Sequence, residues 1–101
     1  KGIIVVMQDG KNIGLINYNK DLLIPQNSVE LSFQINKRLF LKKEILLKSN
    51  SSVVCRVPIN PRESLTFTKV ATSLTNEQKG LILIMFLVEK FTFDVFESSI
   101  V

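Results

Sequence analysis

The stretch that decides the fold is Gly80-Leu81-Ile82-Leu83-Ile84-Met85-Phe86-Leu87-Val88. Its eight consecutive apolar residues stand between charged and polar residues on both sides. On a helix, eight successive residues point in every direction, so the stretch predicts a helix that is enclosed on all sides. Periodicity alone also allows a buried strand, followed by a second strand on which Phe91, Phe93 and Val95 alternate.

A capping signal in front of this stretch favours the helix. Thr75 and Gln78 have the spacing of a capping box, in which the threonine hydroxyl and the glutamine side chain each bond the other residue's backbone. We therefore expect a helix from about Asn76 to about Phe91.

Residues 3–7 and 13–18 predict a β-hairpin. Both runs are rich in apolar and β-branched residues, and Asp9-Gly10 between them suits the positive φ angles of a tight turn. The next ten residues read as a loop or short bridge, in which residues 22–24 form an apolar plug that points inward.

Four further strands are expected downstream. Val29, Leu31, Phe33 and Ile35 alternate with polar residues, which is typical of a half-buried strand. Residues 36–38 are read as a turn, residues 39–48 as a strand with a bulge or an exposed middle at 42–44, and residues 49–52 as another turn. The last two strands are expected at residues 53–59, where Pro58 indicates an edge or a strand end, and at residues 65–70.

Length and composition are those of one folded domain. The chain has 101 residues, 46% hydrophobic and 22% charged. The expected fold class is α+β but mainly β, an antiparallel meander of about six strands curled around or packed on one hydrophobic C-terminal helix. The apolar run is shorter than the roughly 20 residues of a membrane-spanning helix. No signal-peptide pattern is visible, and the single cysteine, Cys55, excludes an internal disulfide, so we expect a cytoplasmic protein.

Residue types give little support to catalysis. Histidine is absent, the acids are scattered, and the four glycines do not form a phosphate-binding loop. Cys55 shares a strand side with Val53 and Val57, so it is expected to be buried and inert. We therefore expect no enzyme activity, no cofactor and no metal site.

Basic residues cluster in the middle of the chain, where only Glu44 opposes them: Lys37, Arg38, Lys42, Lys43 and Lys48. Such a surface suits phosphate head groups of an anionic membrane lipid. The alternative is that these residues protect a turn and an edge strand against aggregation. Nucleic acid is a weaker candidate partner, because only Phe40 lies among the basic residues and single-strand binders need several stacking rings.

Phe91, Phe93 and Phe96 at the end of the predicted helix have two interpretations. They can belong to the core together with Phe86. If the helix end frays, they instead form an apolar patch for a protein partner or a homodimer.

The C-terminal segment resembles a known superfamily. Residues 74–98, Leu74-Thr75-Asn76-Glu77-Gln78-Lys79-Gly80 followed by the apolar run and Glu89-Lys90-Phe91-Thr92-Phe93-Asp94-Val95-Phe96-Glu97-Ser98, resemble the terminal segment of phospholipid scramblases and tubby-C-terminal-like proteins. The resemblance implies a hydrophobic helix inside a closed antiparallel barrel and binding of phospholipid or phosphoinositide head groups. It carries over no individual lipid-contacting residue.

The size of that barrel differs from this chain. The family barrel has twelve strands, whereas the residues before the helix supply about six. A curled half barrel, a dimer, a truncated chain or a coincidental resemblance would each explain this difference. A pleckstrin-homology-like sandwich has the right size, but its C-terminal helix is amphipathic.

The basic cluster and the resemblance together predict a non-catalytic binding module for acidic head groups. The alternative is a protein-interaction subunit that pairs through an exposed strand edge.

Overall fold

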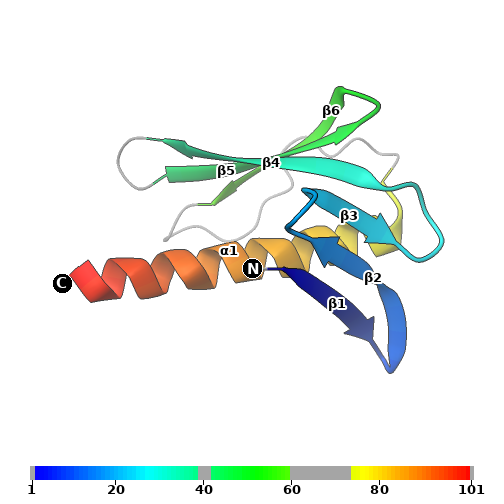
Figure 1. Cartoon of the computed structure of the whole chain (residues 1–101), viewed down its shortest axis with the longest axis horizontal. Helices are drawn as coiled ribbons and strands as arrows, with labels where there is room; N and C mark the ends of the chain where they lie inside the picture. The colour runs from blue at the N-terminus through cyan, green and yellow to red at the C-terminus, as the bar shows by residue number, and fades with distance from the viewer. Residues whose placement is uncertain (1, 39–41, 60–73, 101) are drawn as a thin grey trace.

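The fold is an antiparallel meander of strands packed on one C-terminal helix, as the sequence predicts (Figure 1). The computed structural model describes residues 2–38, 42–59 and 74–100, with the side chains of residues 38, 42 and 92–100 outside that description. The strands lie in the sheet in chain order: β1 (Ile3–Gln8), β2 (Lys11–Asn17), β3 (Leu22–Pro25), β4 (Leu31–Arg38), β5 (Lys42–Ser49) and β6 (Ser52–Ile59). The helix α1 (Asn76–Ile100) follows them.

Two tight turns confirm the local signals in the sequence. Asp9 and Gly10, between β1 and β2, have φ angles of 52° and 78°. Asn50 and Ser51, between β5 and β6, have φ angles of 50° and 70°. Two successive positive φ values match the twist of the strands on either side, which is why these turns make hairpins.

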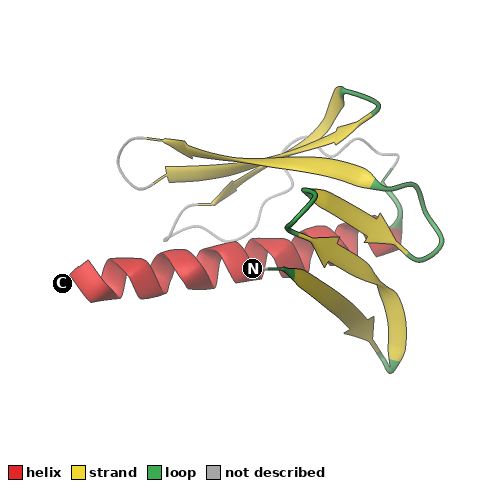
Figure 2. Ribbon diagram, in the orientation of Figure 1, coloured by secondary structure: helices red, strands yellow, loops and turns green. Residues whose placement is uncertain are grey.

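The sheet consists of two halves that are joined by a short contact. β3 pairs with β4 only through Leu22↔Ser32 and Leu23↔Leu31, whereas seven register pairs join β4 to β5. This narrow junction lets the sheet bend. Figure 2 shows β1–β3 crossing one side of α1 while β4–β6 lie along another side, and α1 contacts β2, β3 and β6.

The helix is buried on one side only, which corrects the prediction of a fully enclosed segment. Leu81 and Met85 are 0% exposed, but Leu83 and Leu87 are 42% and 49% exposed. The bent sheet covers one side of α1 and leaves the other side to solvent. The alternative of a strand at residues 81–88 is wrong, because these residues belong to α1.

Five of the six predicted strands correspond to strands of the described residues, whereas β3 was not predicted as a strand. Residues 22–24 were expected as an apolar plug within a loop or short bridge, but residues 22–25 form β3 and pair with β2 through Leu15↔Ile24. The predicted strand at residues 65–70 lies outside the described residues. Val29 precedes β4 and is 66% exposed, so it is not part of the buried strand face.

The boundary between β4 and β5 also differs from the prediction. Residues 36–38 were expected as a turn, but they continue β4 and pair with residues 42–44 of β5. The register is regular there, and the irregularity lies instead between Leu47 and Lys48. Glu44, expected in a bulge or an exposed middle, is only 9% exposed. Pro58 is the next-to-last residue of β6, which confirms the expectation that it lies at an edge or a strand end.

Candidate anion-binding site

Two neighbouring strands bring four of the five predicted basic residues together. Lys37 is the register partner of Lys43, and Arg38 is the register partner of Lys42. Two consecutive rungs of the β4–β5 ladder are thus made of cationic residues on both strands. We call these four residues, at the end of β4 and the start of β5, the basic hairpin end.

Lys48, the fifth predicted residue, does not belong to this group. It pairs with Ser32 at the opposite end of the same two strands. Five residues along a strand separate it from Lys43, which corresponds to roughly 17 Å. The predicted patch of five is therefore a cluster of four and a separate lysine.

The one acid in β4 and β5 is engaged by a third strand. The Glu44 carboxylate accepts a hydrogen bond from Arg56 Nη1 of β6 at 2.8 Å, which is also an ion pair. Glu44 lies one rung from the Lys37–Lys43 pair, and by strand alternation it points to the other face of the sheet. Lys37 itself is exposed and Lys43 is half-buried.

Protection of an edge strand accounts for only part of this cluster. Beyond Leu31 and Ser32, β4 has no register partner on β3 among the described residues. Lys37 therefore stands on an unpaired stretch of strand edge, which a lysine can protect against pairing with another chain. β5, in contrast, is paired on both sides, and Lys43 is the partner of both Lys37 and Ile59. A lysine on an interior strand guards no edge, so edge protection does not account for Lys43.

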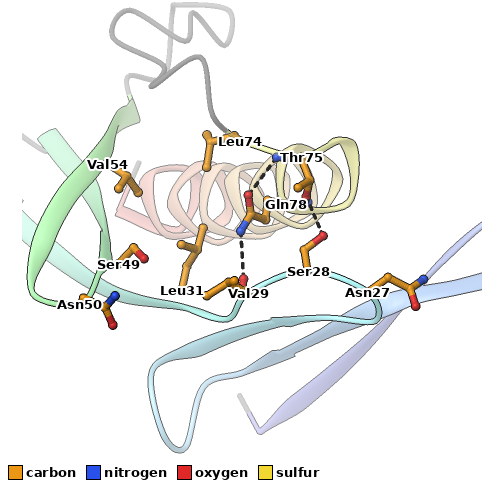
Figure 3. Close-up of a pocket in the computed structure, with 10 residues that line it drawn as sticks. All are labelled: Asn27, Ser28, Val29, Leu31, Ser49, Asn50, Val54, Leu74, Thr75 and Gln78. Atoms are coloured by element: carbon orange, nitrogen blue, oxygen red, sulfur yellow. Dashed lines mark hydrogen bonds between the residues drawn. The ribbon is translucent and has the colours of Figure 1, made fainter.

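A recess lies at the start of α1 (Figure 3). This pocket of about 380 Å³ is bounded by the loop between β3 and β4, the β5–β6 turn, Val54 and the first turn of the helix. Gln78 is 6% exposed, and both ends of its amide are bonded there. Its oxygen accepts from the Thr75 backbone N–H at 2.9 Å, and its nitrogen donates to the Val29 carbonyl at 2.9 Å.

The capping box predicted from the sequence is confirmed at this place. The Gln78 backbone N–H donates to Thr75 Oγ1 at 3.1 Å, which completes the reciprocal pair. Helix N-termini attract anions, but here Glu77 already supplies a carboxylate in the first turn. The pocket is therefore a less suitable place for an anionic ligand than the basic hairpin end.

Cys55 lies in the core and does not line the pocket at the start of α1. Its side chain is 1% exposed, as predicted, on the face of β6 that also carries Val57. Burial raises the pKa of the Cys55 thiol. The reactive thiolate is thus disfavoured at neutral pH.

The structure also buries a charged residue that the sequence pattern placed at the boundary of the helix stretch. Glu89 is 1% exposed, and Tyr18 lies close enough for the two to interact electrostatically. Burial, and then the Glu89 charge, raise the pKa of the Tyr18 phenol. The Tyr18 ring packs edge-on against Phe33, with 5.5 Å between ring centroids. No local signal separates such a buried glutamate from an exposed flanking one.

The phenylalanines at the end of α1 are described only in part. Phe86 is buried at 3% exposure, whereas Phe91 is 71% exposed and so does not belong to the core. The side chains of Phe93 and Phe96 lie outside the described residues. Leu83, Leu87 and Phe91 follow one another at intervals of four, so they share one side of α1.

Comparisons of the chain with models of protein families, with curated proteins and with solved structures gave no match. Within the described part of the chain, no helix has the length and apolar character needed to cross a bilayer. Among the same residues, no group of three or more cysteine or acidic side chains is placed to hold a metal ion.

Proposed function

We propose that this chain is a non-catalytic binding module that holds acidic phospholipid or phosphoinositide head groups at the basic hairpin end. The observation that supports the proposal is the pairing of cation with cation on two consecutive rungs, Lys37↔Lys43 and Arg38↔Lys42. Four cationic residues gathered at one end of a hairpin provide the kind of positive charge that attracts the phosphate groups of anionic lipids.

The expected strength of binding is modest. Consecutive rungs face opposite sides of a sheet, so all four residues approach a membrane only where it meets the end of the hairpin. At about 1 kcal/mol for each basic residue near an anionic membrane, the four then contribute on the order of 4 kcal/mol. That corresponds to a dissociation constant of roughly 1 mM. The module would therefore bind reversibly and depend on salt, as a peripheral membrane protein does at the anionic cytoplasmic leaflet.

The resemblance of residues 74–98 to scramblases and tubby-C-terminal-like proteins supports the same ligand class. One property that the resemblance implies differs in this chain. In the family the helix lies inside a closed barrel, whereas Leu83 and Leu87 of α1 are exposed here. The proposal therefore depends on the cationic rungs first and on the resemblance second.

The test is co-sedimentation of the chain with vesicles that contain phosphatidylserine or phosphoinositide. Replacing Lys37 and Lys43 together by glutamine removes one cationic rung. At about 1 kcal/mol per residue, the double variant should bind roughly 30-fold more weakly. Neutral phosphatidylcholine vesicles should bind neither protein.

The matched control is the double variant K11Q/K20Q, which loses the same net charge at two exposed lysines outside the basic hairpin end, one at the start of β2 and one in the β2–β3 turn. It should retain most of the binding. Equal losses in the two double variants would show that net charge, and not this site, is responsible. Absence of binding by the unchanged chain to anionic vesicles at low salt would refute the proposal.

A second candidate function, a subunit that pairs with a protein partner, is supported by β1. This strand lies at the end of the sheet order, and it contains neither a charged residue nor a proline. The other end strand, β6, carries Arg56 and Pro58. Because natural proteins protect edges with such residues, an edge without them is suited to pairing with another strand.

A further inference from the structure

The face of β1–β3 that points away from α1 is largely apolar, with Asn12 and Asn17 as polar members at its ends. Val5, Leu15 and Ile24 are register partners across the three strands, so their side chains lie on one face. None of the three belongs to the buried core cluster or to the partly buried residues packed against it. Alternation along the strands adds three more apolar members, and we call the apolar residues of this face the outer apolar face: Ile3, Val5, Met7, Leu15, Leu22 and Ile24.

Its exposure is unusual for apolar side chains. Ile3, Val5 and Met7 are 56%, 54% and 58% exposed, and they stand at alternate positions of one strand. The other three are partly buried. An antiparallel sheet with one face on a core normally presents polar residues on the other face. Contiguous exposed apolar residues on a sheet mark an interaction surface.

The other half of the same sheet follows the rule. On the outer face of β4–β6, Gln34 pairs through Leu46 with Arg56, and Asn36 pairs through Glu44 with Pro58. Leu46, which stands among these polar residues, is covered to 9% exposure. Val53 of β6 is also exposed, at 44%, but the contiguous apolar surface of the described sheet lies on β1–β3.

We propose that the outer apolar face is an interface between two copies of this chain, packed sheet against sheet around a two-fold axis. Such an interface is isologous, because the same surface is used by both copies. It would bury apolar residues of both copies in the manner of a β-sandwich. The uncharged edge of β1 adjoins this face, so it would lie at the border of the same contact.

The charges around the face favour a second copy over an anionic membrane. The β1–β2 turn carries Asp9 and has Lys11 next to it, and the β2–β3 turn carries Lys20 and Asp21, all exposed. Each end of the face therefore has one acid and one base. A second copy meets no net repulsion there, whereas an anionic bilayer gains no net attraction.

The size of the face predicts a weak dimer. Three strands and five residues span roughly 10 Å by 17 Å, which is well below the roughly 800 Å² that each partner contributes to a standard interface. We therefore expect a dissociation constant between about 10 µM and 1 mM. The interface would form at high local concentration and dissociate on dilution.

The test is sedimentation velocity of the 101-residue chain over that concentration range, without lipid. The average mass should rise toward twice the monomer mass. V5E places a charge at the centre of the outer apolar face and should keep the chain monomeric throughout. Q34E places the same charge on the polar outer face of β4 and should dimerise like the unchanged chain. Circular dichroism and thermal melting establish that each variant is folded.

If V5E does not fold, M7K tests the same face at its exposed rim and should likewise remain monomeric. A wild-type chain that stays monomeric up to 1 mM would overturn the proposal, and so would equal dimerisation of V5E and Q34E. Binding of a monomeric chain to neutral phosphatidylcholine vesicles, lost in V5E, would overturn it in favour of a lipid occupant. K37Q/K43Q changes the basic hairpin end and leaves the outer apolar face intact, so it should dimerise like the unchanged chain. The dimer and the head-group proposal are therefore tested independently.

Discussion

The carboxylate of Glu77, in the first turn of α1, accepts two hydrogen bonds from Asn27 in the loop between β3 and β4. The Asn27 backbone N–H donates to Oε1 at 2.9 Å, and the Asn27 side-chain amide donates to Oε2 at 3.1 Å. Ser28 adds a third bond to the same carboxylate at 3.1 Å. Fifty residues separate the partners in the chain, so this contact fixes the start of the helix against the bend of the sheet.

Glu77 should make stability depend on pH. The bond from the Asn27 backbone, with those from the Asn27 and Ser28 side chains, lowers the pKa of Glu77 below its ordinary value of 4.5. A lowered folded-state pKa gives stability that is complete above the unfolded-state pKa and is lost as pH falls through the folded-state pKa. E77Q should therefore have a lower urea midpoint than the unchanged chain at pH 7. The difference should shrink in acid.

The control for this prediction is E30Q, which changes an exposed glutamate near the same loop. Its urea midpoint should differ little from that of the unchanged chain at either pH. A deficit in E77Q that stays constant from neutral to acid pH would contradict the assignment, because loss of a charge-dependent bond must follow protonation.

Thr75 should contribute to stability through its hydroxyl. T75A removes the acceptor for the Gln78 backbone N–H and the contact of Thr75 Oγ1 with Ser28 Oγ at 2.9 Å. Loss of an N-cap side chain costs about 1 kcal/mol in the free energy of unfolding, measured by urea denaturation. T75S keeps a hydroxyl in place and should lose less than half of that. An equal loss in both variants would assign the effect to the methyl group.

Features encoded by neighbouring residues were predictable from the sequence. The Asp9-Gly10 turn and the Thr75–Gln78 capping box each need only a few adjacent positions, and both are confirmed. The basic hairpin end was predictable in part, because a hairpin brings together residues on either side of its connection. The grouping of Lys48 with these residues was wrong, because each residue along a strand adds about 3.3 Å and Lys48 is five residues from Lys43.

Features that depend on distant partners were not predictable in this way. β3 has only four residues and owes its strand conformation to pairing with β2 and β4. The exposed side of α1 could not be found either, because Leu81 and Leu83 have the same chemistry and only the bent sheet distinguishes them. The outer apolar face, in contrast, has a signal in the sequence itself. Residues 3–7 are apolar at every position, which is typical of a strand with partners on both faces.

Gly14 should be intolerant of any side chain. A Cβ at this position would lie 2.5 Å from the Ile24 carbonyl oxygen and 3.1 Å from Leu81 Cδ1, and its φ of 143° disfavours other residues. G14A should lower the free energy of unfolding by about 2 kcal/mol or more, through overpacking and backbone strain. G10N is the control. Its turn φ of 78° suits asparagine and no atom lies within 4 Å, so it should lose about 1 kcal/mol or less.

The one-sided burial of α1 predicts that two leucines of the same helix differ in their contribution. Leu81 is 0% exposed, so L81A leaves a cavity between the helix and β2 and should cost about 2–5 kcal/mol in the free energy of unfolding. Leu83 is 42% exposed, so L83A removes little buried surface and should cost less than about 1 kcal/mol. Urea denaturation of the two variants measures both values at a protein concentration of a few µM. A helix enclosed on all sides would instead give two similar large losses, because each leucine would then leave a cavity of comparable size.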